Sequence, residues 1–179
     1  MPILLPKNGE GFTLRTFMRE DAMHLAEIEF DVEVKKFLVI PKKDKSQWIN
    51  EFNPDTYHGY AIDINGVLAG RVSLIPKEGV HELAIVIGKP FLGSKLGRKV
   101  APMLIRAAFD ELNTKALVAV VHPNHQASIN LLRAFKFRRR GIVESSESYQ
   151  QGFFIYRMSQ GTYNLTFERD RPEAACPSI

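Results

Sequence analysis

Apolar and polar residues follow a two-residue period near the start of the chain and a helical period soon after it. In Phe12 to Phe17, apolar Phe12 and Leu14 alternate with Thr13 and Arg15, which predicts a strand. Asp21 belongs to a residue type that caps helices. After it, apolar residues recur at helical spacing, at Ala22, Leu25, Ile28 and Val32. A second short helix is expected to begin near Asp44 or Ser46 and to bury Trp48, Ile49 and Phe52.

Two apolar runs in the middle of the chain, Tyr57–Ile64 and Val67–Ile75, are joined by Asn65-Gly66. Asn-Gly between such runs is a strong hairpin signal, because both residues tolerate positive φ. Pro76–Gly79 predicts a further turn, and Val80–Ile87 predicts a third strand. The pattern therefore indicates a three-stranded meander.

The next segments return to a helical pattern and then to an apolar strand. A glycine-bearing loop, Gly88 to Gly97, leads to a predicted helix over Arg98–Leu112. Pro102 lies inside this helix and removes one backbone donor. Ala116–Val121 is apolar almost throughout, as expected of a strand buried on both faces.

The last part of the pattern completes the expected fold. Pro123-Asn124 opens another predicted helix, and residues 137–146 and 152–159 are expected to form a closing antiparallel pair. The order of elements predicts a mixed α/β fold, with a mostly antiparallel sheet of six or seven strands and flanking helices. Residues 1–160 are expected to form a single domain, and residues 161–179, which lack clear periodicity, a C-terminal tail.

Composition narrows the class of protein. The chain has 179 residues, of which 45% are hydrophobic, and a formal net charge of +4. This excludes an intrinsically disordered chain, and the lone Cys176 excludes an internal disulfide framework. No apolar run reaches the ~20 residues of a membrane-spanning helix, and residues 1–10 hold no signal-peptide core. A cytoplasmic protein without a membrane partner is therefore expected.

The segment Gly88–Arg98 suggests a binding site, because it joins a predicted strand to a predicted helix. Glycines let backbone N–H groups turn toward a ligand, and a helix N-terminus carries a charge of about +0.5. Together with Lys95, Arg98 and Lys99, they would suit a pyrophosphate. A turn that only reverses the chain is the alternative. The loop lacks the Gly-Lys-Ser/Thr ending of a triphosphate-binding loop, and no later strand carries the acidic residue of a dinucleotide-binding fold.

A second segment, Val121–Ser128, has the pattern of a strand end, a turn and a helix start, with Asn124 as a suitable N-cap. In this order and at this separation, the two segments resemble the GNAT superfamily of acetyl-coenzyme A-dependent N-acetyltransferases. The resemblance covers Phe12 to Ser159. The cofactor loop of this family reads Gln/Arg-x-x-Gly-x-Gly/Ala, often with a glycine in second place.

The loop Leu92–Gly97 occupies the first of the family's motifs. Gly93 and Gly97 fit it, whereas Leu92 stands in place of Gln or Arg and Lys95 in place of a glycine.

The family's second motif reads roughly Asn-x-Ala-Ser, followed by a helix that ends in Gly-Phe. Ser128 and Phe137 fit it, whereas His125 replaces the asparagine and Lys136 the glycine.

The resemblance implies that the predicted strands 80–87 and 116–121 splay apart, with the pantetheine arm of acetyl-coenzyme A between them. It implies that this arm pairs with the strand edge at Ile85, Val86 and Ile87, where a backbone N–H polarises the thioester carbonyl. The other cofactor contacts that it implies are Leu92, Gly93, Ser94, Lys95, Leu96, Gly97, Arg98, Asn124 and Ser128.

Glu82 is the candidate general base, since many family members carry an acidic residue ten positions before the start of the loop. An alkyl amine has a pKa of about 10.4, so a base must remove a proton before it attacks. Burial in a cleft would raise the pKa of Glu82 toward a useful range. The alternative is an exposed strand residue paired with a nearby Lys or Arg. His81 competes from the opposite strand face, and His122 from the strand across the splay.

A general acid for the departing thiolate is missing from its usual place. Many family members carry a tyrosine five residues before the motif's phenylalanine, and Leu132 stands there. Tyr149 or Tyr156 could take that role, or the thiolate could leave unassisted, because a thiol has a pKa of about 8.5.

Other polar groups favour structural roles. Arg138-Arg139-Arg140 is interpreted as a solvated strand face, with an RNA-binding patch as the alternative. His122 and His125 fit a turn and a helix cap better than a zinc site, so no metal is expected.

Taken with the resemblance, these patterns predict an acyltransferase that moves the acetyl group of acetyl-coenzyme A to a primary amine of a small molecule or a protein N-terminus. Neither a metal nor a specific nucleic acid is expected as a partner. A non-catalytic acyl-coenzyme A sensor and, less favoured, a basic RNA-binding module are the alternatives. The identity of the acceptor and the formation of a homodimer stay open.

Overall fold

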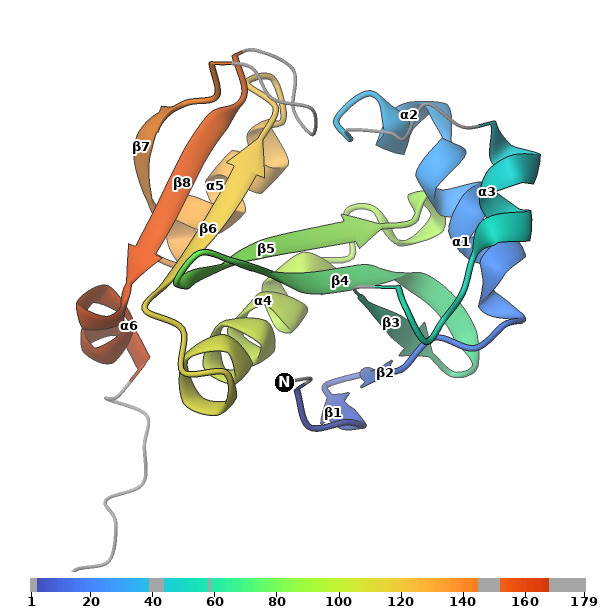
Figure 1. The fold of residues 1–179 in the computed structure, drawn as a ribbon, viewed down its shortest axis with the longest axis horizontal. Helices are drawn as coiled ribbons and strands as arrows, with labels where there is room; N and C mark the ends of the chain where they lie inside the picture. The colour runs from blue at the N-terminus through green and yellow to red at the C-terminus, as the bar shows by residue number, and fades with distance from the viewer. Residues whose placement is uncertain (1–2, 39–43, 58, 145–151, 168–179) are drawn as a thin grey trace, which may run out of the picture.

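The computed structural model describes residues 3–38, 44–57, 59–144 and 152–167. Within these residues the strands form one eight-stranded sheet in the order β1-β2-β3-β4-β5-β6-β8-β7 (Figure 1). All neighbouring strands are antiparallel except β5 and β6, which are parallel. The predicted α/β class with a mostly antiparallel sheet and flanking helices is confirmed.

The strands are β1 (Lys7–Gly9), β2 (Phe12–Arg15), β3 (Tyr60–Ile64), β4 (Val67–Lys77), β5 (Val80–Ile87), β6 (Ala116–Val121), β7 (Arg138–Ile142) and β8 (Phe154–Ser159). The helices are α1 (Asp21–Phe30), α2 (Val32–Lys35), α3 (Lys45–Glu51), α4 (Leu96–Arg106), α5 (Gln126–Ala134) and α6 (Gln160–Phe167). A 3-10 turn, η1 (Lys89–Phe91), precedes α4, and a π-helical turn, η2 (Ala107–Glu111), follows it. Strand β1 was not predicted, which accounts for eight strands in place of six or seven.

The central meander is built by local sequence signals. Asn65 and Gly66 adopt φ values of 52° and 83° at the predicted hairpin between β3 and β4. Gly70 allows β4 and β5 to approach closely, because a Cβ at this position would lie 2.2 Å from the carbonyl oxygen of Val86. This contact holds β4 against the C-terminal half of β5, where Gly70 pairs with Ile87.

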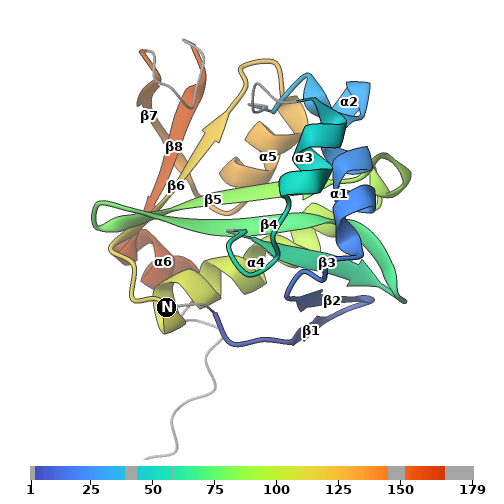
Figure 2. The ribbon, with the colours of Figure 1, turned by 45° about the vertical axis from the view of Figure 1, so that its right-hand side comes forward.

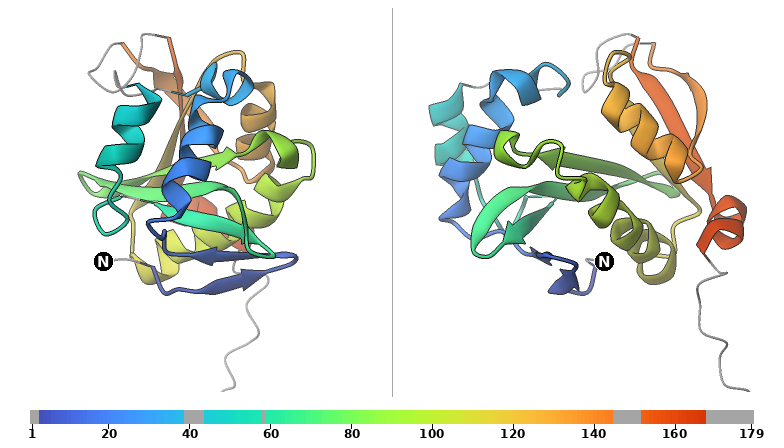
Figure 3. Two further views of the ribbon diagram at one scale, coloured as in Figure 1. Left: turned by 90° about the vertical axis from the view of Figure 1, so that its right-hand side faces the viewer. Right: turned by 180° about the vertical axis from the view of Figure 1, so that it is seen from behind.

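Strands β5 and β6 separate soon after they meet. Their ladder contains only the pairs His81–Leu117 and Glu82–Val118. Beyond Glu82, β5 continues to Ile87 beside β4, and β6 continues to Val121 beside β8 (Figures 1 and 3). The predicted splay of these two strands is confirmed.

Two apolar cores cover the two faces of the sheet. One joins the sheet to α4, α5 and α6 and includes Leu104, Leu117, Ile129 and Tyr156. The other lies under α1 and α3 and includes Leu25, Trp48 and Val86. Helices α1 and α3 lie side by side, and α1 packs on β4 (Figure 2), whereas α4 crosses the opposite face (Figure 3, right).

The prediction that Asp21 caps α1 is wrong. Glu20 occupies the N-cap, and the buried carboxylate of Asp21 accepts hydrogen bonds from Arg15 at 2.7 and 3.0 Å and from the N–H of Met18 at 2.7 Å. Although burial acts to raise the pKa of Asp21, the hydrogen bonds from Arg15 and Met18 lower it on balance. The residue therefore ties α1 to β2 instead of capping a helix.

The helical spacing predicted to continue to Val32 stops before that residue. Helix α1 ends at Phe30, and Asp31 leaves the helical conformation with ψ of 133°. Its side chain accepts hydrogen bonds from the N–H groups of Glu33 and Val34 and so caps α2. This turn leaves Val32 72% exposed and buries Val34 instead.

Helix α3 follows its sequence pattern. Asp44 is its N-cap and forms a capping box with Gln47. Trp48 and Phe52 are buried as expected, whereas Ile49 is only half-buried.

Helix α6 was not predicted, since it falls in the segment assigned to the tail. Its Tyr163 is buried, stacks on Phe109 with ring centroids 4.4 Å apart, and donates a hydrogen bond to Asp110 at 2.7 Å. Cys176 lies outside the described residues. Among the residues described, no helix is long and apolar enough to cross a membrane.

Candidate active site

A cavity of about 1520 Å³ opens where β5 and β6 diverge. Its walls come from β4 and β5, from α2 and the residues that follow it, from the loop before α4, and from the end of β6 with α5. Strand β5 contributes every residue from Glu82 to Ile87. Because successive strand residues point to opposite faces, the cavity has access to both sides of the sheet.

The edge of β5 at Ile85–Ile87 lies in this cavity, beyond the last residue that pairs with β6. Val86 packs in the core under α1 and α3, and Ile85 packs against the core on the other face. The backbone of this edge is therefore available for pairing with an extended ligand.

Glu82 lies at the point where the two strands part. Glu82 is 7% exposed and lines the cavity, and its Oε2 lies 3.8 Å from Nζ of Lys77. Both of the competing descriptions of this residue hold in part, because it has the burial expected of a general base and also a cationic neighbour. Its role as a base stays a prediction.

The two histidine competitors differ in position. His81 is not among the cavity-lining residues, and its buried Nδ1 has no hydrogen-bond partner among the residues described. Burial lowers the pKa of His81 below its ordinary value. His122 does line the cavity, but its Nδ1 accepts a hydrogen bond from the N–H of Asn124 at 3.1 Å.

The start of α5 differs from the prediction. The helix begins at Gln126, and His125, rather than Asn124, occupies the N-cap without a side-chain hydrogen bond. The ring of His125 stacks on Phe37, with centroids 4.2 Å apart and planes 1° from parallel. Burial, together with the nearby His122 and Lys36, lowers the pKa of His125. Asn124 and Ser128 both line the cavity.

The glycine-bearing loop forms the other end of the cavity, and Leu92, Gly93, Lys95, Leu96, Gly97 and Arg98 line it. Ser94 is not among the lining residues; its Oγ donates to the carbonyl oxygen of Phe91 at 2.6 Å and accepts from the N–H of Leu96 at 3.3 Å.

Three backbone amides of this loop are available to an anion. The N–H groups of Gly93, Lys95 and Gly97 donate to no acceptor among the described residues, whereas that of Arg98 donates to the carbonyl oxygen of Lys95 at 2.9 Å. Lys95, at the N-cap of α4, has φ of 62°, in the left-handed region. Free amides at a helix N-terminus suit a phosphate group.

No described tyrosine lines the cavity. Leu132 is buried in its wall, and Tyr156 lies in the core, 1% exposed. Tyr149 falls outside the described residues. Among the residues that the structure describes, no tyrosine is therefore placed to protonate a thiolate in this cavity.

Sequence reasoning missed the β4 wall of the cavity. Arg71, Ser73 and Ile75 lie there at every second position, as one strand face requires. Arg71 pairs with the buried Glu29, which also accepts a hydrogen bond from Tyr57 at 3.2 Å. Mainly through burial, the pKa of Tyr57 is raised well above its ordinary value. The strand period was visible in the sequence, but nothing in it indicated which face would meet the cavity.

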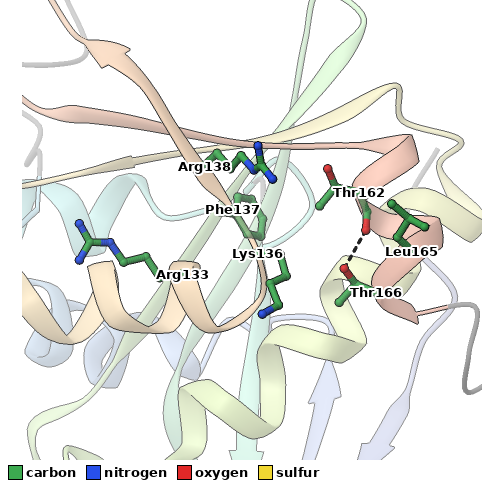
Figure 4. A pocket seen from close by; sticks show the side chains of 7 residues that line it. All are labelled: Arg133, Lys136, Phe137, Arg138, Thr162, Leu165 and Thr166. Carbon is green, nitrogen blue, oxygen red and sulfur yellow. Dashed lines mark hydrogen bonds between the residues drawn. The ribbon is translucent and has the colours of Figure 1, made fainter.

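A second hollow, of about 450 Å³, lies between the end of α5, β7 and α6 (Figure 4). Its lining includes Arg133, Lys136 and Arg138 but no carboxylate or imidazole that could act as a base. Among the residues described, no cluster of His, Cys, Asp and Glu side chains could hold a metal ion.

Residues 12–138 match the family model of the acetyltransferase (GNAT) domain. This protein is a member of the GNAT acetyltransferase family. It is accordingly an acyltransferase, and acetyltransferases of this family use acetyl-coenzyme A. A search of curated proteins gives no significant match.

Solved structures of acetyltransferases share this fold. A GNAT-family acetyltransferase from Bacillus anthracis is 17% identical, with a TM-score of 0.72, and the match covers 87% of this chain and 98% of that one. The spermidine/spermine N-acetyltransferase SpeG from Vibrio cholerae, in mutant forms, is 18% identical with a TM-score of 0.69, covering 86% and 96%. RimJ from Mycobacterium smegmatis, in complex with CoA-disulfide, is 12% identical with a TM-score of 0.67, covering 84% and 82%.

Proposed function

We propose that this acyltransferase moves the acetyl group of acetyl-coenzyme A to a primary amine of a small molecule or a protein N-terminus. The observation that carries the proposal is the single cavity that joins the free amides around the start of α4, the unpaired edge of β5 and the carboxylate of Glu82. An anion site, a site for an extended arm and a candidate base then follow one another along one cavity.

The cofactor end of the cavity would hold the pyrophosphate of acetyl-coenzyme A on the amides of Gly93, Lys95 and Gly97. Lys95 and Arg98 add positive charge beside them. The pantetheine arm would run along Ile85–Ile87, beside Asn124 and Ser128. A backbone N–H of this edge would donate to the thioester oxygen as negative charge develops on it.

Glu82 would remove a proton from the acceptor ammonium, directly or through water, so that the neutral nitrogen can attack the acetyl carbon. The carbon–nitrogen bond forms, the carbon–sulfur bond breaks, and the thiolate leaves. The second nitrogen proton accompanies the departure of the sulfur. With Leu132 in place of the usual tyrosine, we expect the thiolate to take this proton without a side-chain acid.

The acceptor side of the cavity favours an amine attached to an apolar body. Val34, Phe37, Ile75, Ala84 and Phe153 line it. Its charged groups include the pair Lys36–Glu33 and also Arg71, which pairs with Glu29 outside the lining. A polyamine would need several uncompensated carboxylates. Although SpeG, which shares the fold, is a spermidine/spermine N-acetyltransferase, we therefore rank an apolar or aromatic primary amine first.

A panel of amines tests the proposal. Purified protein is incubated with acetyl-coenzyme A and each of several arylalkylamines, polyamines and peptides with free N-termini, and release of free thiol is followed with mass spectrometry of the acetylated product. We expect thiol release to depend on the amine. Binding of acetyl-coenzyme A without turnover on any amine would favour the sensor alternative, and no binding would contradict the cofactor site itself.

A further inference from the structure

The hydroxyl of Ser73 is a buried polar group without a partner in the wall of the cavity. Ser73 is 0% exposed, and its Oγ has no hydrogen-bond partner among the described residues. A buried hydroxyl left unsatisfied destabilises a fold, and such groups are uncommon in native proteins. Its position in β4, at a residue that lines the candidate active site, indicates that a ligand satisfies it.

The register of the sheet places Ser73 next to Glu82. Ser73 lies opposite Ala84, and Glu82 lies opposite Ile75, in the β4–β5 ladder. The two residues are therefore diagonal neighbours on the same face of an antiparallel pair. The Cβ atoms of such neighbours lie roughly 7–8 Å apart or somewhat less, so one amine group or one water can lie between the two side chains. Both residues line the same cavity.

We propose that the Ser73 hydroxyl is a direct contact for the acceptor amine and works with Glu82. The inference rests on the proposed amine acetylation and adds a residue to it. A serine hydroxyl both accepts and donates a hydrogen bond, so it can accept from the amine while it donates toward a carboxylate. Rotation about χ1 moves Oγ between three staggered positions, which lets a hydroxyl that is covered in the free protein turn toward a bound amine.

The proton inventory is complete with these two residues. The acceptor arrives as an ammonium ion, and one of its protons passes to the carboxylate of Glu82 while Ser73 Oγ accepts a hydrogen bond from the nitrogen. The nitrogen lone pair then forms the bond to the acetyl carbon. The carbon–sulfur bond breaks with its electron pair on sulfur, and the sulfur takes the second proton, which gives the amide and free coenzyme A.

Ser73→Ala separates this role from a structural one. Because the substitution removes an unsatisfied hydroxyl without adding volume, we expect a higher unfolding midpoint than that of the parent. At the same time kcat/KM for the best amine of the panel should fall about 10- to 100-fold, the effect of losing one hydrogen bond to a charged or polar ligand. The affinity for coenzyme A, measured by calorimetry, should stay unchanged.

Thr114→Ala is the matched control. Thr114 is also buried, but its Oγ1 donates to the carbonyl oxygen of Ala116 at 2.8 Å, and it does not line the cavity. This variant should lower the unfolding midpoint and leave kcat/KM unchanged. Changes of opposite sign in the unfolding midpoints of the two variants, with a loss of kcat/KM in Ser73→Ala alone, would identify the Ser73 hydroxyl as a ligand contact.

The outcomes distinguish this inference from the function on which it rests. A parent enzyme that acetylates an amine, with a Ser73→Ala variant of equal kcat/KM, would overturn the role of Ser73 and leave the proposed function standing. A variant that is less stable and loses activity only in proportion to its unfolded fraction would assign Ser73 to structure. If the parent releases thiol with no amine of the panel, the proposed function fails and the role of Ser73 with it.

Discussion

Two lysines stand where the GNAT motifs have glycine, and both keep the backbone conformation that glycine serves. Lys95 has φ of 62° at the start of α4, and Lys136 has φ of 65° after α5. A left-handed conformation costs a residue with a Cβ roughly 1–2 kcal/mol, which glycine avoids. The motif therefore specifies a backbone conformation, and the chain maintains it at two places despite the side chain.

Lys136→Gly should stabilise the protein, because it removes this strain at an exposed position outside the large cavity. We expect the free energy of unfolding, from urea titration, to rise by about 1 kcal/mol. Lys136→Ala is the control, since it removes the same charge and keeps the strain. Equal stabilities of the two variants would show that the backbone at residue 136 is not strained.

Glu82→Gln should remove the base while it keeps the size of the side chain. We expect the turnover rate to fall by roughly 10²–10⁴-fold and the acidic limb of the pH–rate profile to disappear, with little change in coenzyme A affinity. Glu78→Gln, in the exposed turn between β4 and β5, is the control. Near-normal turnover of the Gln variant at all pH values would assign proton removal to another group and return Glu82 to its pairing with Lys77.

At the scale of elements, a helix N-terminus gains its chemistry from groups that the helix itself leaves unbonded. The amides of Lys95 and Gly97 belong to this class in α4. A Cβ at Gly97 would meet Cδ2 of Leu131 at 3.5 Å, which is an ordinary contact, so the fold has room for one there. The glycine at this position is then explained by the approach of a ligand rather than by packing.

Gly97→Val should therefore abolish the stabilisation that coenzyme A gives without unfolding the protein. In the parent, ligand at about 100 times its dissociation constant should add about 2.7 kcal/mol to the free energy of unfolding. Gly70→Ala is the contrasting variant, because its Cβ would overlap the carbonyl oxygen of Val86 and destabilise the fold even without ligand. A Gly97→Val protein that still binds coenzyme A like the parent would contradict the phosphate site.

Strand β7 exposes all three residues of the basic run, Arg138 to Arg140. Arg139 lies over the ring of Phe154 at 3.6 Å, and Arg138 faces the smaller hollow of Figure 4. Replacing Arg138 and Arg140 by Ser should leave coenzyme A affinity intact. In a filter-binding assay, any RNA binding by the parent should be weak and vanish near physiological salt. Tight, sequence-selective RNA binding at that salt would favour the RNA-binding alternative.

At the scale of the whole molecule, local signals predicted most of the fold, and long-range packing decided the rest. The Asn65-Gly66 hairpin and the Asp44 cap are properties of a few neighbouring residues, and both are confirmed. The packing of Tyr163 on Phe109 depends on partners distant in sequence. The end of α1 at Asp31 depends on a local cap, in which Asp31 accepts from the N–H groups of Glu33 and Val34, and the apolar period does not show this cap. The cavity was predicted only through the family resemblance. Its β4 wall, with Ser73, could not be predicted, because the sequence does not show which strand face meets a ligand.

Two half-buried imidazoles should make the stability of the whole molecule depend on pH. Burial lowers the pKa of both His81 and His125, whereas in the unfolded chain a histidine has a pKa of about 6.5. Below that value the unfolded state binds more protons than the folded state. The contribution of the two histidines to the free energy of unfolding is therefore complete at pH 7.5 and is lost as the pH falls toward 5. Asp21 acts in the same direction but at lower pH, because its unfolded pKa is about 3.9. Urea titrations at pH 7.5 and 5.5 should therefore show the loss in the parent, and His125→Asn should reduce it. Equal free energies of unfolding at the two pH values would mean that neither ring is held neutral by the fold.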